Sequence, residues 1–261
     1  MQRSGGFTLV ELVMVIVLLG IVATISVQFV ALSTRGAIDA GDRQQRSLKA
    51  VVVSVLITRM LREAFPLSIR VTGPTDNCLE WLPIEGATTY TNLPSAGGTT
   101  IEAVPFSRVP TGGGLRAVVY GYGGSANQFY SPPVANSGPM SPPIANNGID
   151  NSTEPASITL SSSHRFDSTS PARRLFVVSG PHALCSEPGV LALYQGYDIG
   201  NPYTDGNRGI LMANLVGDAE FSFVPASLQR AAVVQFTFEL GTPGSTETLE
   251  VSQEVQIRTV P

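Results

Sequence analysis

Residues 3–25, "RSGGFTLVELVMVIVLLGIVATI", decide the fold, because they join a Gly-Gly-Phe sequence to an apolar run that contains one carboxylate, Glu11. A charge at the centre of a bilayer costs about 2.5 to 3.5 kcal/mol on insertion scales. No side chain from Leu12 to Leu32 is charged, and this length suits a membrane-spanning helix. The sequence therefore predicts a spanning helix in which Glu11 needs a compensating partner.

The residues before the apolar run set the expected orientation and processing. They carry Arg3 and no acidic residue, so the positive-inside rule predicts that residues 1–6 stay in the cytoplasm and that the rest is exported. An ordinary secretory signal has its small cleavage-site residues after the apolar stretch. Here Gly5 and Gly6 come before it, so a cut at Gly6 would leave the helix on the mature protein.

Residues 5–12, "GG" followed by "FTLVEL", resemble the processing site of type IV prepilins and of the pseudopilins of type II secretion. The resemblance implies that a prepilin peptidase/N-methyltransferase cuts between Gly6 and Phe7 and methylates the new amine of Phe7. It also implies that Glu11 is the acidic residue in the fifth mature position, which the family uses in assembly.

Cleavage at Gly6 would create a cationic amine one helical turn before Glu11. In an assembly, Glu11 of an incoming subunit can meet the free amine of its neighbour. A low dielectric strengthens this contact and makes an unpaired carboxylate costly. We therefore expect Glu11 to favour the assembled state over the isolated subunit.

A second helical segment is expected at residues 33–65, so that one helix runs from about Phe7 to Ala64 and stops before Pro66. Its amphipathic pattern predicts an apolar stripe that packs on a sheet. The stripe consists of Leu48, Val51, Val52, Val55, Leu56 and Leu61. Arg59 and Glu63 are spaced as an i, i+4 ion pair on the more polar side.

The remainder, residues 66–261, is predicted to be a β-rich head. Short β-prone runs alternate with turn signals, and residues 231–260 are typical of a hairpin with a Gly-Thr-Pro-Gly-Ser turn. A repeat, "SPPVANSG" at 131–138 and "SPPIANNG" at 141–148, favours extended and turn geometry. It is interpreted as an exposed insertion, or as a loop that contacts a neighbouring subunit.

Two cysteines, Cys78 and Cys185, lie in the exported part, and neither belongs to a Cys-x-x-Cys motif. A disulfide is the natural interpretation for an exported chain. The alternative is two unrelated buried thiols, each acting as a small apolar side chain.

The resemblance extends beyond the N-terminus. Residues 58–71, 77–94, 173–185, 211–240 and 251–261 are similar to the MshO family of minor pilins of the mannose-sensitive haemagglutinin (MSHA) pilus system, which is related to PilW-like pilins and J-type pseudopilins. This implies a pilin-like α+β fold, with the first half of a long helix in the membrane and the second half packed on an antiparallel β-rich head. It also implies a disulfide between Cys78 and Cys185.

The composition argues against several other classes. The chain has a net charge of −4 and a single lysine, Lys49, whereas nucleic-acid binding needs clustered basic residues. His164 and His182 lack metal-ligand spacing, and no nucleophile elbow or phosphate-binding glycine loop is present. Asp198, Asn201, Asp205 and Asn207 offer oxygen ligands without an EF-hand spacing. No catalytic activity, cofactor or metal is predicted.

The expected protein is a low-abundance type IV pilin that primes assembly or forms the filament tip. Its leader would be residues 1–6, its membrane and assembly helix 7–32, its helical continuation 33–65 and its periplasmic or extracellular head 66–261. The expected partners are major and minor pilins, the processing peptidase, the assembly platform and the inner membrane. The alternatives are a minor pseudopilin of a type II secretion-like system and an adhesin displayed at the tip.

Overall fold

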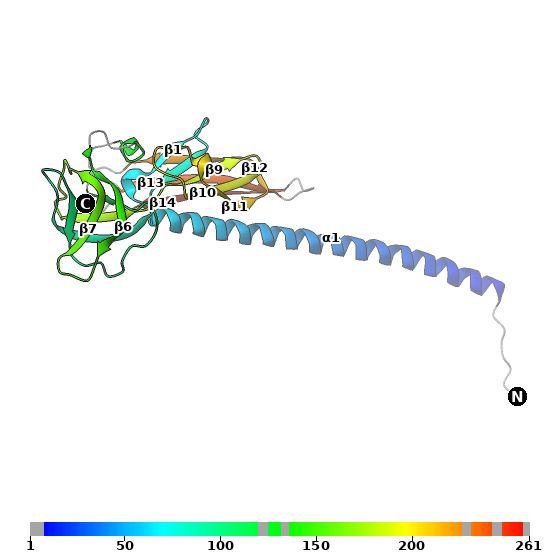
Figure 1. The fold of residues 1–261 in the computed structure, drawn as a ribbon. Coiled ribbons are helices and arrows are strands. Elements are labelled where there is room, and N and C mark those ends of the chain that lie inside the picture. Colours follow the sequence, from blue (N-terminus) through cyan, green and yellow to red (C-terminus); the bar gives the residue numbers. More distant parts are fainter. Residues whose placement is uncertain (1–7, 120–124, 132–135, 226–230, 242–246, 258–261) are drawn as a thin grey trace. The chain divides into compact units, whose positions relative to one another are not determined.

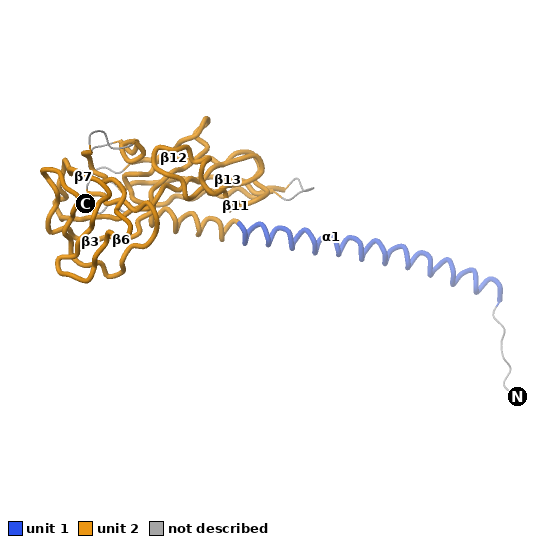
Figure 2. Tube along the Cα trace, viewed as in Figure 1, with its two compact units in different colours: residues 1–49 blue, residues 50–261 orange. Residues whose placement is uncertain are grey.

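The structure, a computed structural model, describes residues 8–119, 125–131, 136–225, 231–241 and 247–257. The chain divides into two compact units, residues 1–49 and 50–261 (Figure 2). The first unit holds most of a single long helix. The second unit holds the end of that helix and the described strands.

Helix α1 spans Leu9–Arg62, close to the expected range of Phe7 to Ala64 (Figure 1). The helix ends before Pro66, as predicted. Pro66 begins a short 3-10 turn, η1 (Pro66–Ser68), and the preceding Phe65 has an extended backbone. The predicted ion pair is also present, with Arg59 Nε 3.2 Å from Glu63 Oε1 on an exposed surface.

The strands of the second unit form two antiparallel sheets and a barrel. The five-stranded sheet has the order β1 (Arg70–Thr72), β2 (Cys78–Trp81), β9 (His182–Glu187), β10 (Val190–Gln195) and β11 (Asn207–Ala213). The three-stranded sheet has the order β12 (Leu215–Val224), β13 (Ala232–Gly241) and β14 (Thr248–Ile257). The expected hairpin is confirmed by the ten-residue pairing of β13 with β14.

The closed barrel has the order β3 (Ile84–Asn92), β4 (Gly98–Ala103), β7 (Ala156–His164), β6 (Met140–Asp150), β5 (Arg116–Val118) and β8 (Arg174–Val178). Two short 3-10 turns, η2 (Ala126–Phe129) and η4 (Tyr203–Asp205), lie in connections of the second unit. All barrel strands fall between β2 and β9 in the chain, and β2 and β9 pair directly with each other. The barrel is therefore an insertion whose two ends return to neighbouring strands of one sheet.

One apolar core joins the end of α1 to both sheets. The helix contributes Ala50, Val53, Ile57 and Leu61, all buried, and the sheets contribute large side chains such as the fully buried Trp81 and Phe236. The expectation of a long N-terminal helix packed on antiparallel sheets in an α+β fold is confirmed.

The predicted packing face of this helix was mostly wrong. Of the expected stripe only Leu61 is buried, whereas Val51, Val52 and Val55 are 58%, 57% and 61% exposed. The reason is that residues 50–57, "AVVVSVLI", are apolar almost all round the helix, so periodicity alone cannot choose a face.

The interpretation of the second proline-rich segment as an exposed insertion was also wrong. Residues 141–148 lie within β6, and Ser141 and Ile144 are buried. The register between β6 and β7 shifts between Ile144 and Ile149, and the exposed Asn146 and Asn147 lie in this irregular stretch. Pro142 and Pro143 lie near the start of β6, where its pairing with β5 is irregular, and strands accept proline at such irregular positions. Of the first copy, residues 132–135 lie outside the described residues.

Candidate processing and assembly segment

The first turn of α1 is capped by Thr8. The N–H of Glu11 donates to Thr8 Oγ1 at 3.3 Å, and the N–H of Leu12 donates to the Thr8 carbonyl at 3.2 Å. A Thr followed three residues later by Glu has the spacing of a capping box, in which the cap satisfies N–H groups that the helix leaves unpaired. Sequence reasoning missed Thr8, although the Thr-x-x-Glu spacing was its signal.

The side chain of Glu11 is exposed, and its carboxylate makes no hydrogen bond or ion pair with the residues that the structure describes. Its place in the first turn of α1 is favourable for a negative charge because of the helix dipole. Gly5, Gly6 and Phe7, the predicted processing residues, lie outside the described residues.

The apolar segment that follows is exposed along its whole length. Every large apolar side chain from Leu9 to Leu32 is at least 44% exposed. Among the described helices, α1 is long and apolar enough to cross a membrane, with a mean hydropathy of 2.7 in its most apolar part. Thr24 Oγ1 donates to the Gly20 carbonyl at 2.8 Å, so this hydroxyl is satisfied within the helix. Burial of these side chains has to come from a lipid phase or from other chains.

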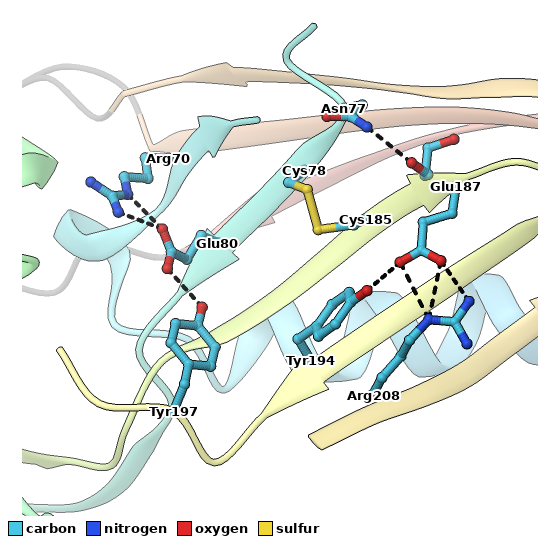
Figure 3. Close-up of a disulfide and its surroundings, with 10 residues drawn as sticks. Arg70, Asn77, Cys78, Glu80, Cys185, Glu187, Tyr194, Tyr197 and Arg208 are labelled. Atoms are coloured by element: carbon cyan, nitrogen blue, oxygen red, sulfur yellow. Dashed lines mark hydrogen bonds and ion pairs between the residues drawn. A yellow bond between two sulfur atoms is a disulfide. The ribbon is translucent and has the colours of Figure 1, made fainter. Parts of the chain in front are cut away.

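Cys78 and Cys185 form a disulfide that links β2 to β9 (Figure 3). The two residues are direct cross-strand partners, with Cα atoms 4.1 Å apart, and both side chains are buried. The bond therefore ties the strand that leads into the barrel to the strand that leaves it.

A buried carboxylate, Glu80, lies on β2 two residues beyond the disulfide (Figure 3). Arg70 of β1 approaches it with Nη2 2.6 Å from Oε2, and Tyr197 donates its hydroxyl to Oε1 at 2.6 Å. Burial and the nearby Glu80 charge raise the pKa of Tyr197. The guanidinium also lies 3.7 Å from the centre of the Tyr130 ring.

Both carboxylate oxygens of Glu80 are thus satisfied inside the head, and Arg70 connects β1, β2 and the η2 turn through its bond to Asn127. Removing one partner of such a buried pair is costly because the other charge is left uncompensated. The sequence offered no signal for this network, since Tyr197 lies 117 residues from Glu80 and the pairing of Arg70 with Glu80 depends on the β1–β2 register.

A second polar cluster lies on the same face of this sheet as Glu80, around Glu187 of β9 (Figure 3). Arg208 of β11 donates to Glu187 at 2.5 Å, and the hydroxyl of Tyr194 donates to the same carboxylate. The hydrogen bond from Arg208 is the main reason that the pKa of Glu187 lies below its usual value. This partly buried cluster links β9, β10 and β11 through their side chains.

Neither polar cluster is a metal site. The described residues contain no group of three or more His, Cys, Asp or Glu side chains arranged to hold a metal ion. The oxygen-bearing residues noted between positions 198 and 207 lie in different elements: Asp205 ends the η4 turn, and Asn207 begins β11.

Two clefts lie on the barrel side of the head. One, of about 600 Å³, is lined by residues 144–149 of β6 and by the loop before β5. The other, of about 540 Å³, lies beside Arg116, His182 and Asp198. Burial lowers the pKa of Arg116, and the Asp198 charge opposes this shift. Arg116 already donates to the Ser141 carbonyl. These clefts have no arrangement of groups that indicates a reaction.

Comparison with known proteins identifies the N-terminal segment. Residues 1–27 match the family described as the prokaryotic N-terminal methylation motif. Neither the curated proteins nor the solved structures include one that matches the chain. The matched motif ends inside the exposed apolar part of α1, whose capped first turn carries Glu11. The chain therefore has a type IV prepilin-like N-terminus, and its long helix packed on antiparallel sheets is a pilin-like α+β fold.

Proposed function

We propose that the chain is a minor type IV pilin of an MSHA-type pilus system, which primes assembly or forms part of the filament tip. The observation that carries the proposal is the exposed, uncharged helix segment from Leu12 to Leu32, which begins one residue after Glu11 and most of which lies within the methylation motif. Such proteins are generally structural subunits, and this role needs no catalytic group.

In this proposal the prepilin peptidase/N-methyltransferase cuts between Gly6 and Phe7 and methylates Phe7. The helix then holds the subunit in the inner membrane, with its head on the outer side, until the assembly platform moves it into the filament. Glu11 pairs with the terminal amine of a neighbouring major or minor pilin. The five blocks that are similar to MshO-type minor pilins support the MSHA assignment.

Mass spectrometry of sheared filaments tests this proposal. The protein is quantified against the major pilin, and its N-terminal peptide is read in the same sample. Trace amounts that begin at methylated Phe7 support a processed minor subunit. Absence from filaments, with the processed form left in the membrane, favours a pseudopilin-like assembly factor.

A deletion strain separates the assembly role from adhesion. Loss of a priming subunit lowers the number of pili. A tip adhesin would instead leave the pilus number unchanged and reduce binding to the target surface, and this outcome would contradict the assembly role.

A further inference from the structure

The cleft beside Arg116 lies where the barrel meets the five-stranded sheet. Arg116 belongs to barrel strand β5, His182 belongs to sheet strand β9, and Asp198 follows β10. The cleft has a volume of about 540 Å³. Small-molecule sites have volumes of about 300 to 1,000 Å³ and often form where two domains meet. The space is therefore large enough for a ligand of the size of a sugar unit.

Arg116 supplies the positive charge of this cleft and has no carboxylate in contact with it. Its side chain is half-buried, and it donates to the Ser141 carbonyl at 3.1 Å. It makes no ion pair with the residues that the structure describes, and the other residues of the chain include no Asp or Glu. A half-buried guanidinium without an acidic partner favours an anion from outside the chain.

The neighbouring titratable groups limit the charge of that anion. Burial lowers the pKa of His182 from 6.5 to about 4, so its ring is neutral near pH 7 and adds no positive charge. The exposed Asp198 acts on Arg116 electrostatically without being in ion-pair contact with it. A phosphate dianion would be repelled by Asp198 more strongly than a single carboxylate. The cleft therefore suits a ligand with one negative charge.

The rest of the lining is small and mixed in polarity. It includes Ser179, the glycines Gly113 and Gly180, and the apolar Pro143 and Ile199. A Cβ added at Gly113 would meet no other atom within 4 Å, so the cleft is open beside this residue. Polar groups that fix orientation, next to apolar surface, are usual in small-molecule sites. A sugar ring matches this mixture because it has hydroxyls at its rim and C–H groups on its faces.

We propose that this cleft binds a carboxylated sugar, of the class of the uronic and sialic acids. The guanidinium of Arg116 pairs with the sugar carboxylate, which its planar donor groups can bind through two parallel hydrogen bonds. Asp198 accepts a hydrogen bond from a hydroxyl of the same sugar. The site lies in the head, so the inference goes beyond the assembly role proposed for the chain and does not depend on it.

Glycan binding by the full-length protein in detergent tests the proposal. The probes are oligosaccharides that end in glucuronate, galacturonate or N-acetylneuraminate, each paired with its carboxyl methyl ester, which lacks the charge. We expect at least one acidic probe to bind, and its ester to bind at least about tenfold more weakly. Preference for N-acetylneuraminate would indicate animal-cell glycans as the source, and preference for a uronate would indicate polysaccharides. If no acidic probe binds, or if acids and esters bind equally, the proposal is wrong.

Two substitutions test whether the binding occurs in this cleft. Arg116→Met removes the guanidinium, whereas Gly113→Phe leaves Arg116 in place and puts a ring into the open space. Each should lower the affinity for the acidic probe by about tenfold or more. The matched controls Arg108→Met and Ser161→Phe make the same kinds of change at exposed positions outside this cleft, and they should bind as the wild type does. Normal binding by Arg116→Met and Gly113→Phe would exclude the cleft as the site.

Acetate separates a sugar site from a site for any carboxylate. Acetate should displace the acidic probe only at a concentration at least about tenfold above that of the probe. Asp198→Ala should weaken binding of the acidic probe and strengthen binding of acetate, because Asp198 accepts a sugar hydroxyl but repels a free anion. Displacement by acetate at equal concentration, or tighter binding of the acidic probe by Asp198→Ala, would contradict recognition of the sugar.

Discussion

Glu11 combines two physical roles that a substitution can separate. Its backbone N–H is part of the cap made by Thr8, and its carboxylate lies in a helix turn where negative charge is favourable. Its proposed role in assembly depends only on the charge. Both Gln and Ala keep the backbone N–H and remove the charge, but Gln also keeps a capping-box side chain, whereas Ala does not.

We expect Glu11→Ala and Glu11→Gln to insert in the membrane and to be cut before Phe7 as in the wild type, and both to be depleted from filaments. The measurement is the ratio of filament protein to membrane protein for each variant. Wild-type incorporation of Glu11→Gln, with loss only in Glu11→Ala, would assign Glu11 to helix capping instead.

His182 makes the head sensitive to acid. Its ring lies edge-on to Trp81, with ring centres 5.8 Å apart, and burial lowers its pKa from 6.5 to about 4. The unfolded chain therefore binds more protons than the folded chain between these values, so stability is full above pH 6.5 and falls as the pH drops toward 4. The upper limit of this loss is about 3 kcal/mol, reduced by the ring's remaining exposure.

The check is the melting temperature of wild type and His182→Gln from pH 7 to pH 4. The carboxylates and His164 are common to both proteins, so the difference between the two curves isolates His182. We expect the wild type to lose more stability than the variant over this range. Parallel curves would rule out His182 as the source.

At the level of elements, the sequence could not show which of the two apolar faces of α1 packs against the sheets. The helix, its end before Pro66 and the β13–β14 hairpin could be predicted, because periodicity, proline and turn residues act locally. The choice between two apolar faces depends on which sheet residues meet the helix, and that is set by distant strands. The strand nature of residues 141–148 was likewise hidden, because Pro-Pro and Asn-Gly are turn signals unless neighbouring strands supply the pairing.

Matched alanine substitutions test this assignment of faces. Ile57→Ala removes a side chain that is 1% exposed and should destabilise the head by about 2 to 5 kcal/mol. Val55→Ala, two residues away on the exposed face, should change the unfolding free energy by less than about 0.5 kcal/mol. Urea unfolding of both variants measures the difference, and equal losses would mean that the faces are assigned wrongly.

At the scale of the whole molecule, the head depends on one covalent link between distant segments. Cys78 and Cys185 are 107 residues apart in the chain, so the disulfide restricts a long loop in the unfolded state. The chain-entropy model gives a stabilisation of about 4 to 5 kcal/mol for a loop of this size.

We expect the double variant Cys78→Ala, Cys185→Ala to unfold at a clearly lower urea concentration than the wild type. Alanine keeps both buried positions apolar, so the loss reports mainly on the missing link. The single variant Cys78→Ser should lose at least as much stability, because it also places a hydroxyl in a buried position. Unchanged unfolding midpoints would show that the fold does not need the bond.

The barrel lies entirely within the loop that this disulfide closes, since β3 to β8 fall between Cys78 and Cys185. A protease that cuts an exposed barrel loop would therefore divide the chain without releasing either fragment. The two pieces would migrate together in a non-reducing gel and separate only after a reductant is added. A subunit nicked in this way at the cell surface would keep its head covalently attached to its helix.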